Sequence, residues 1–570
     1  MNLTKKILAG ACSLALFASA KAATVYVGVT TDADVSTVID LGARTIRSNG
    51  NATVSVSGSD AAFQTALGGG TYTAASATQP ASWSWGAADT FILQELVFIT
   101  NGVLAIDAGS IVRGQPDGGT FNPGALAIGR GAKIIANGNV GAPIIFTGAG
   151  TGATGIVRAS GSSPAFWDNN PVGAPKPATD GGKWGGLLVL GNALVNSDRN
   201  PATPAQEYFD IDGLNAVATD DRFSIEGIPT ATTAFIGGYD RFGGFANNDN
   251  SGIMTYLSIR HGGANLAPAN EINGLTLGAV GRGTTINYIE IWGNTDDGIE
   301  IFGGNVNLDH VAVFAQQDDG IDLDVGYTGT IQFALVINSA GSDKLGEWDG
   351  SYQSETSINS VAYPASGPMS AGLIPTANFV VANATLIGNR PTGANTNFVS
   401  GLHIRDQAAP RFLNSIVVNP GTVGTSGPIE FDNRATGAQS TVNLLDREVS
   451  FFKGITFVVT DGAYAATATG FINNGSLSNT IARAKLSLAK FENTFDTVNP
   501  FPTAVPVLGV LPVGFDPRPS SAIGASFEEE FVASTANYSA AAYRGAFESG
   551  NPLWTNDWTA AAASGLLTNL

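Results

Sequence analysis

Acidic residues recur at a fixed spacing near the middle of this 570-residue chain. The segment Asp-Asp-Gly-Ile-Glu at 296–300 returns, 22 positions later, as Asp-Asp-Gly-Ile-Asp at 318–322. Carboxylate oxygens are hard ligands, and Ca²⁺ binds about six to eight of them at one site. We therefore predict a Ca²⁺ site that draws on the acidic residues in and beside the two segments, namely Asp296, Asp297, Glu300, Asp318, Asp319, Asp322 and Asp324.

The spacing also predicts the elements that position these residues. A repeat of about 22 residues, with short apolar runs and Gly or Asn at the corners, is typical of one rung of a solenoid. If Ile299 and Ile321 face the core, Glu300 and Asp322 point outward on adjacent rungs, with Asp324 beside them. Strands stacked ~4.8 Å apart would bring two bare carboxylates into a repulsion of roughly 3 kcal/mol at an effective dielectric of 20. A cation, a shared proton or solvent must offset it.

The same aspartates have two other interpretations. Asp side chains accept backbone N–H bonds at tight turns, so a structural role at the corners is one alternative. A catalytic use is the other. Residues 247–252 with Asp240 form a smaller candidate cation site, whereas residues 210–213 lack the spacing of an EF-hand loop.

We expect an all-β fold, a right-handed parallel β-helix with rungs of about 22 residues. A second repeat supports it, because residues 103–112 are echoed by 125–134, which pairs Ile106 with Ile128, Gly109 with Gly131 and Val112 with Ile134. Only 13% of the residues are charged and 72 are Gly, as expected for a small-residue surface with many tight corners. The expected parts are a signal peptide at 1–22, an N-terminal β cap or small β subdomain at 23–90, the β-helix at 91–500 with loop excursions at 148–183 and 195–250, and a C-terminal wrap and cap at 501–570.

The first 22 residues predict export. Lys5 and Lys6 precede an apolar run that ends in an Ala-Lys-Ala cleavage pattern at 20–22, and Cys12 raises lipidation as an alternative. The apolar run is too short for a membrane span, and no later segment is suited to one. Removal of residues 1–22 takes away three of the 28 basic residues and leaves 25 against 47 acidic ones, a net charge of −22. Such a protein repels nucleic acid, and we expect it in the extracellular space or on the outer cell surface, with the periplasm as an alternative.

Each of the three histidines, His261, His310 and His403, lies in or beside a predicted strand, and for each a structural role is expected. His310 is the one histidine that we would test for function, because we expect it to lie beside the acidic ladder formed by the two acidic segments. Asn383 and Asn414 occupy matching places in their strands and predict an Asn ladder at a corner. A helix near 481–491 is expected to cover the end of the stack.

Several motifs together resemble a family of exported bacterial proteins with a pectin-lyase-like β-helix. They are IEGIPTA at 225–231, SGIMTYLSIRHGG at 251–263, EINGLTLGAVGRGTTINYIEIWGN at 271–294, GEWDG at 346–350, WGGLLVLGNA at 184–193 and FDPRPSSAIG at 515–524. The resemblance covers most of residues 91–560 and implies the fold and export.

Two further resemblances concern chemistry. Asn-Thr-Asp at 294–296 and Asp-Asp at 318–319 resemble the polygalacturonases, which implies that Asp297, Asp318 and Asp319 are the carboxylates of an inverting glycosidase. The Gly-His-Gly expected one rung later is replaced by residues 339–344, and no Arg-x-Lys follows. Leu-Asp-His at 308–310 resembles the pectate lyases, which implies Ca²⁺ between acidic side chains, but Arg390-Pro391 departs from their arginine motif.

Three functions follow from these observations. The first is a calcium-stabilised protein with an adhesive, structural or carbohydrate-binding role at a polysaccharide or cell-surface glycan. The second is a glycoside hydrolase or lyase that degrades acidic polysaccharide with the acidic corner. The third is a self-assembling filament subunit, in which strands within 23–60 pair with another copy.

Overall fold

A computed structural model describes the chain at residues 24–28, 36–48, 54–55, 59–116, 123–150, 168, 170–172, 175–195, 223–228, 238–244, 246–265, 272–350, 377–388, 401–419, 429–431, 441–446, 448–460, 482, 484–505, 513–521, 523 and 539–568. The predicted signal peptide, Cys12, residues 210–213 and Arg390-Pro391 lie outside the described residues. Among the helices that the structure does describe, none has the length and apolar character needed to cross a bilayer.

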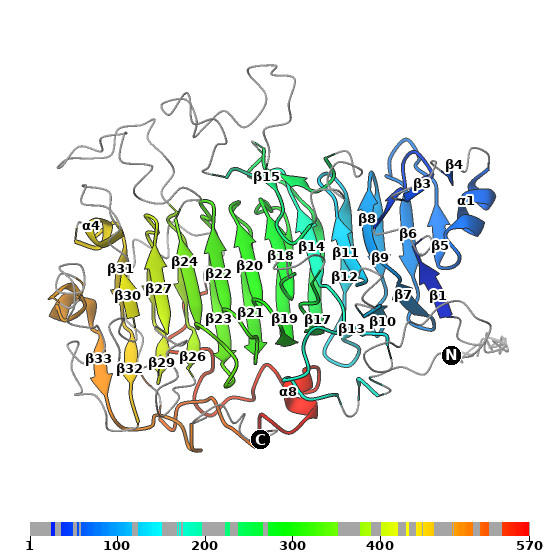
Figure 1. Ribbon diagram of the computed structural model, residues 1–570. Helices are drawn as coiled ribbons and strands as arrows, with labels where there is room; N and C mark the ends of the chain where they lie inside the picture. The colour runs from blue at the N-terminus through cyan, green and yellow to red at the C-terminus, as the bar shows by residue number, and fades with distance from the viewer. Residues whose placement is uncertain are drawn as a thin grey trace, which may run out of the picture.

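The described residues form an elongated stack of strands (Figure 1). Nearly all pairings are parallel, and each complete rung adds one strand to a 12-stranded sheet and one long or two short strands to a 19-stranded sheet. The predicted right-handed parallel β-helix is confirmed. The 12-stranded sheet contains β2 Ser36–Asp40, β3 Thr45–Ser48, β4 Val54–Ser55, β8 Leu96–Thr100, β11 Ala125–Ile128, β14 Leu187–Leu190, β18 Leu275–Gly278, β20 Ile299–Phe302, β22 Ile321–Asp324, β24 Gly346–Asp349, β27 Leu402–Arg405 and β30 Ile429–Phe431.

The 19-stranded sheet bends around the rest of each rung. Its strands are β1 Thr24–Val27, β5 Thr71–Thr73, β6 Ser82–Trp85, β7 Thr90–Leu93, β9 Val103–Ile106, β10 Ile111–Gly114, β12 Lys133–Asn137, β13 Ile144–Gly148, β17 Gly252–Gly262, β19 Thr285–Asn294, β21 Asn307–Phe314, β23 Thr330–Ile337, β25 Val380–Ala382, β26 Thr385–Ile387, β28 Arg411–Leu413, β29 Ile416–Val418, β31 Phe451–Lys453, β32 Thr456–Val458 and β33 Thr494–Asp496. A short antiparallel pair, β15 Phe223–Ser224 and β16 Arg241–Phe242, lies in the second excursion.

The acidic repeat has the predicted register. Ile299 pairs with Ile321 and Glu300 with Asp322, so the two segments lie on adjacent rungs. Both isoleucines belong to the main apolar core between the sheets, which leaves the two carboxylates on the outer side. Burying each such side chain stabilises the fold by about 1.5–3 kcal/mol, and this drives the in-and-out alternation.

The register predicted for residues 103–134 is wrong. Ile106 pairs with Ala136, and Ile128 pairs with Ile99. The two segments are alike only locally, since each is a strand, a turn with glycine at positive φ (Gly109 and Gly131, +83° and +82°) and a second strand. Register depends on pairing around a whole rung, and the connecting loops vary in length from rung to rung.

From β17 to β32, each described rung of the 19-stranded sheet turns at a residue in the left-handed conformation. In β17, β19, β21 and β23 these residues are Tyr256, Tyr288, His310 and Phe333, with φ between 51° and 57°. The corresponding residues of later rungs are Asn383 and Asn414, so their predicted correspondence is confirmed. The described side-chain hydrogen bonds of Asn383 join it to Gln332 and to the carbonyl of Tyr543 rather than to Asn414, so they do not form the predicted Asn ladder.

Helices lie at both ends of the stack (Figure 1). Helix α1 (Asp60–Ala66), capped by Ser59, lies at the N-terminal end, and α4 (Thr441–Asp446) with η1 (Ala489–Phe491) lies at the C-terminal end. Strands β1, β2 and β6 pair in parallel with β7, β8 and β9. The parallel rungs therefore begin inside the range expected for the N-terminal cap.

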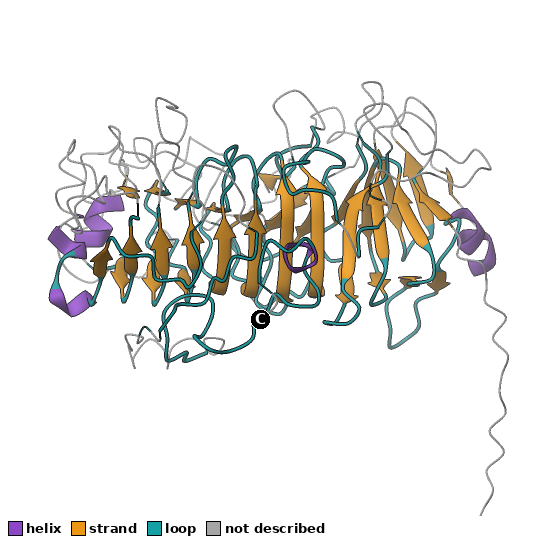
Figure 2. Cartoon of the chain, turned by 90° about the horizontal axis from the view of Figure 1, so that it is seen from below, coloured by secondary structure: helices purple, strands orange, loops and turns teal. Residues whose placement is uncertain are grey.

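Residues 539–568, here called the C-terminal strap, lie on the side of the β-helix rather than on its end. The strap runs back along the 19-stranded sheet to α8 (Ala560–Ala563), which lies over the middle strands (Figure 2). The backbone N–H groups of Ala560 and Ala561 donate to Glu290 on β19, at 2.7 and 2.9 Å. The expected end cap thus becomes a flank contact for these described residues.

Candidate functional site

One outward column of the 12-stranded sheet carries most of the ionisable side chains of the site. Its pairings run from strand to strand through Thr276, Glu300, Asp322, Glu347, His403 and Glu430. The next outward positions on β22, β24 and β27 are Asp324, Asp349 and Arg405. We call these positions, together with the Asp corners that precede β20 and β22, the acidic face.

At the corners, two aspartates hold the rungs together. Asp297 Oδ1 accepts the N–H of Asp319 at 2.8 Å, and Asp319 Oδ1 accepts the N–H of Lys344 at 2.8 Å. Both aspartates are buried, whereas Asp296 is half-buried and Asp318 is exposed. The structural role considered for corner aspartates is therefore present, and it occupies one carboxylate oxygen of each.

The corner and column carboxylates gather in three groups. They are Asp296, Asp297 and Asp318; Asp297, Glu300 and Asp322; and Asp318, Asp319 and Asp343, each with ligand atoms within 4.8 Å of one another. Two oxygens that each bind one Ca²⁺ at about 2.4 Å are at most about 4.8 Å apart, so each group has the dimensions of a shared cation site. Six of the seven predicted ligands belong to these groups.

Asp324 is the predicted ligand that lies outside these groups. Its Oδ1 accepts the N–H of the next residue, Val325, at 2.6 Å. It belongs to the second outward column, where it pairs with Phe302. Asp343 takes part instead, although sequence reasoning did not select it.

The group of Asp297, Glu300 and Asp322 has the least compensated oxygen. Asp322 Oδ1 is buried and accepts no hydrogen bond from any described residue. Glu300 accepts a bond from the amide of Asn273, which also contacts Thr276. A buried carboxylate oxygen without a donor is costly unless a cation or a proton meets it.

Burial and mutual repulsion raise the carboxyl pKa values of this face. Burial, followed by the charge of neighbouring carboxylates, raises the pKa values of Asp297, Glu300 and Asp322 well above their usual range. Burial raises the pKa of Asp319 to about 8, although Lys344 opposes the shift, and burial raises that of Asp324 to about 6. Without a metal ion, burial and mutual repulsion therefore favour the protonated forms of these carboxyls.

Two cationic side chains and a histidine lie at one end of the acidic face. Lys344 Nζ lies 2.8 Å from Asp343, 3.2 Å from Glu347 and 3.5 Å from Asp319. The guanidinium of Arg405 contacts Glu347 at 2.9 Å, and His403 Nδ1 lies 2.9 Å from the same carboxylate. Burial alone would raise the pKa of Glu347, but the hydrogen bond with His403 and the charges of Lys344 and Arg405 outweigh it and lower that pKa to about 2.

Arg405 also clamps Asp349, to which its Nε donates at 2.6 and 2.7 Å. Sequence reasoning missed Lys344, Glu347, Asp349 and Arg405, and assigned His403 only a structural role. A signal was present, because Gly346–Asp349 and Leu402–Arg405 alternate between apolar and charged residues. Because residues 350–400 separate the two strands along the chain, their pairing could not be predicted from the local sequence pattern.

The other two histidines lie outside the acidic face. The expectation that His310 lies beside the acidic ladder is wrong, since it belongs to the 19-stranded sheet and stacks on Tyr288 with ring centroids 4.5 Å apart. His261 is buried, and burial lowers its pKa to about 3. His403 is the histidine that pairs with an acidic group of the site.

The smaller cation site expected at 247–252 uses its oxygens within the loop. Asn247 Oδ1 accepts the N–H of Leu194, and Asn250 Oδ1 accepts that of Gly252. Asp249 accepts bonds from Asn192 and Ser251. Within the described ranges, the three carboxylate groups include neither Asp249 nor Asp240, so a cation here stays a prediction.

Comparison with protein families gives one match. Residues 224–495 match the pectate-lyase-like β-helix domain, and this range includes the whole acidic face. No curated protein and no solved structure gives a significant match to the chain.

Proposed function

Since residues 224–495 form a pectate-lyase-like β-helix domain, we propose that this protein binds Ca²⁺ on its acidic face and uses the ion to hold an acidic polysaccharide. Its role is then adhesive or structural, at a polysaccharide matrix or a cell-surface glycan. The protein acts outside the cytoplasm in this proposal, as the predicted signal peptide indicates. Extracellular modules bind Ca²⁺ with dissociation constants of about 10⁻⁴–10⁻³ M, which suits a site assembled from a few carboxylates.

The observation that carries the proposal is the buried, donor-free Oδ1 of Asp322 beside Asp297 and Glu300. Protonation satisfies one such carboxyl at a time, whereas a divalent cation neutralises several together. Asp297 and Asp318 each belong to two of the groups, so neighbouring ions would occupy a continuous row across three rungs.

A cation also explains how an acidic surface could bind an acidic glycan. The net charge of the sequence is −19, so long-range electrostatics repel a polyuronate. Ca²⁺ that retains open coordination positions can take oxygens from a uronate as well as from the protein. Lys344 and Arg405 would supply direct contacts to further carboxylates at the cationic end.

The test begins with the metal alone. We expect purified protein comprising residues 23–570 to melt at a higher temperature in Ca²⁺ than in chelator, and Asp322→Asn to remove most of that difference. The control is Asp446→Asn, an exposed carboxylate on α4 away from the acidic face. Equal melting temperatures in Ca²⁺ and chelator would reject the metal site.

The second step uses immobilised polygalacturonate and a neutral glucan of similar length. We expect retention on polygalacturonate in Ca²⁺, release by chelator, and no retention on the glucan. Retention that survives both chelator and Asp322→Asn would separate glycan binding from the metal.

A second candidate, a hydrolase of acidic polysaccharide, is favoured by the protonation expected at one corner. Asp318 is exposed, and Asp319 beside it is buried with a pKa raised to about 8. Two neighbouring carboxyls, one exposed and one buried, can divide the acid and base roles of glycoside hydrolysis. Asp297 lies at the same corner, so the three predicted catalytic residues are neighbours.

Reducing-end release separates the two candidates. If the protein is a hydrolase, release occurs on a polyuronate in Ca²⁺ and falls by at least about a hundredfold in Asp318→Asn and Asp319→Asn. Absence of release from a folded, glycan-binding protein would leave binding as the function. Size-exclusion chromatography with and without residues 23–60 tests the proposed filament.

A further inference from the structure

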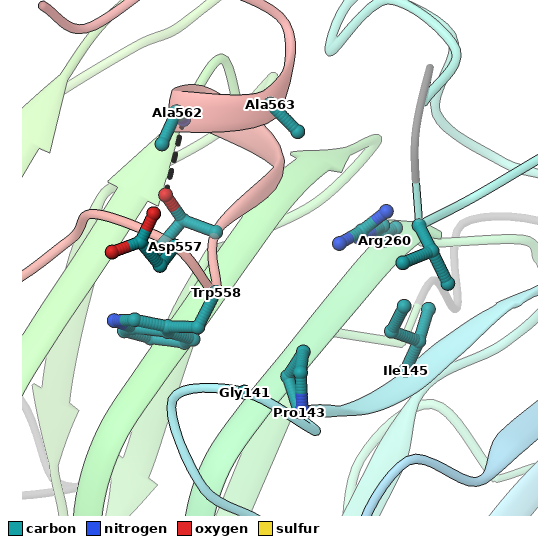
Figure 3. Close-up of a pocket in the computed structure, with 10 residues that line it drawn as sticks. Gly141, Pro143, Ile145, Arg260, Asp557, Trp558, Ala562 and Ala563 are labelled. Carbon is teal, nitrogen blue, oxygen red and sulfur yellow. Dashed lines mark hydrogen bonds between the residues drawn. The ribbon is translucent and has the colours of Figure 1, made fainter. Parts of the chain in front are cut away.

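A small cavity lies between the C-terminal strap and the flank of the 19-stranded sheet (Figure 3). Its volume is about 180 Å³. Trp558, Thr559 and Ala562 line it from the strap, and Pro143, Ile145 and Arg260 line it from the β-helix. It is separate from the acidic face, which belongs to the other sheet.

Among the described lining residues, Arg260 carries the one formal positive charge, and the exposed Asp557 carries a negative one. The residue is 2% exposed, its Nε donates to Ser258 Oγ at 2.6 Å, and its Nη1 donates to the carbonyl of Pro171. Its Nη2 donates to no residue that the structure describes. Figure 3 places the guanidinium and Trp558 on opposite sides of the cavity.

Two carboxylates, Glu290 and Asp168, act on Arg260 by charge without a direct ion pair among the described residues, and the buried Oδ2 of Asp168 accepts no hydrogen bond from any of them. Glu290 reaches Arg260 only through the shared hydroxyl of Ser258, and its oxygens also accept the N–H groups of Ala560 and Ala561. Among the described residues, no carboxylate oxygen lies within the 4.0 Å of an ion pair from the guanidinium. Buried cations are normally met by a direct counterion, so the position in front of Nη2 is suited to an anionic oxygen.

The rest of the lining is mostly apolar. Pro143, Ile145, Val172, Trp558 and Ala562 form the walls. Val172 is 61% exposed, so an apolar surface continues from the cavity to its mouth. Thr559 Oγ1 is held by the N–H of Ala562 at 3.1 Å, the bond drawn in Figure 3, so it caps α8.

We propose that this cavity binds a small carboxylic acid with an apolar body, such as an aromatic or branched aliphatic acid. The carboxylate accepts a charge-assisted hydrogen bond from Arg260 Nη2, and the body packs against Ile145 and Trp558. The volume suits about ten non-hydrogen atoms, fewer than a drug-sized ligand. Because strap and β-helix each supply one side, the ligand also stabilises the docked strap.

The test compares benzoate with benzamide, which have nearly the same shape and differ in charge. Both are titrated against the full-length protein in chelator, with tryptophan fluorescence and melting temperature as readouts. We expect saturable binding of benzoate and at least about tenfold weaker binding of benzamide. Equal binding of the two, or no binding of benzoate up to about 10 mM, would overturn the proposal.

Two variants locate the binding. Arg260→Gln removes the cation and is expected to reduce benzoate binding to the level of benzamide. Ala563→Phe keeps Arg260 and its bonds and places a ring at the cavity, because Ala563 is an exposed lining residue. Val513→Phe adds a ring at a residue that is 90% exposed and serves as the matched control. Unchanged benzoate binding in folded Ala563→Phe would place the binding elsewhere and refute the assignment.

Discussion

Two buried glutamates of the same rung have opposite surroundings. Glu290, on the flank, accepts bonds from Ser258 and from two backbone N–H groups of the strap, and Arg260 lies nearby. Glu300, on the acidic face, has Glu226, Asp297 and Asp322 as its charged neighbours. The charge of Glu290 is compensated within the protein, whereas no cation from the described residues lies beside Glu300, so the acidic face requires protons or an external cation at this point.

The aromatic residues reinforce this contrast. On the flank, Tyr256 stacks on Tyr288 with centroids 4.4 Å apart, and Trp554 packs edge-on against His310 at 5.1 Å. Outward positions there are covered by the C-terminal strap. In a β-helix, one outer face can therefore be covered by packed residues that stabilise the fold, while the other stays open for binding.

The largest effect is expected from Glu290→Gln. The amide cannot accept all three bonds and leaves Arg260 without its nearest compensating charge, so we expect a loss of about 3 kcal/mol in the free energy of unfolding. Chemical denaturation measures the loss, and limited proteolysis should show earlier cleavage of the strap. Glu548→Gln, on an exposed strap residue, is the control and should change little. A variant as stable as the parent would remove the claimed role of Glu290.

The free energy of unfolding should depend on pH because of the carboxyls of the acidic face. Raised carboxyl pKa values mean that the folded protein holds more protons than the unfolded chain between about pH 4 and pH 8, so stability falls as pH rises through this window. In chelator we expect the free energy of unfolding to drop by at least about 1.4 kcal/mol from pH 5 to pH 8, and Ca²⁺ to reduce the drop. The pKa of Glu347 is lowered to about 2, so its ionised form stabilises the fold, and this stabilisation is lost only as the pH falls below about 4.5. Constant stability across the window would contradict the raised values.

In chelator, Glu300→Gln should increase the free energy of unfolding, whereas Glu290→Gln should decrease it. In chelator the substitution removes repulsion from the neighbouring carboxylates, and we expect a gain of about 1 kcal/mol in stability. In Ca²⁺ the variant should lose that advantage because a ligand is missing. Denaturation curves in both buffers measure the reversal, and destabilisation in chelator would mean that Glu300 is structurally satisfied.

The smallest effect is expected from Glu226→Gln. Glu226 is exposed in the second excursion, and both its charge and its side-chain hydrogen bond with Glu300 raise the pKa of that buried residue. Solvent screens such a residue, so we expect a change of about 0.5 kcal/mol or less in Ca²⁺ binding, measured by calorimetry. A larger loss would place Glu226 among the metal ligands.

Much of the fold was predictable because its signals are local. Gly and Asn corners, apolar alternation and the acidic repeat predicted strands, sheets and the pairing of Glu300 with Asp322. The pairing of residues 103–112 with 125–134 failed because local likeness does not determine register. The cationic end was missed because a long segment separates its two strands in sequence.

The sequence by itself determined which side chains alternate inward and outward, since a strand places neighbouring residues on opposite faces. It therefore placed Asp297, Asp318 and Asp319 at one corner and Glu300 and Asp322 in one column. Only the tertiary structure decided what covers each outward face. The strap meets Glu290 although 270 positions separate Glu290 from Ala560, and Lys344 and Arg405 reach one carboxylate from different rungs. Such contacts depend on how the rungs stack and where the tail docks, and no local pattern of residues carries that information.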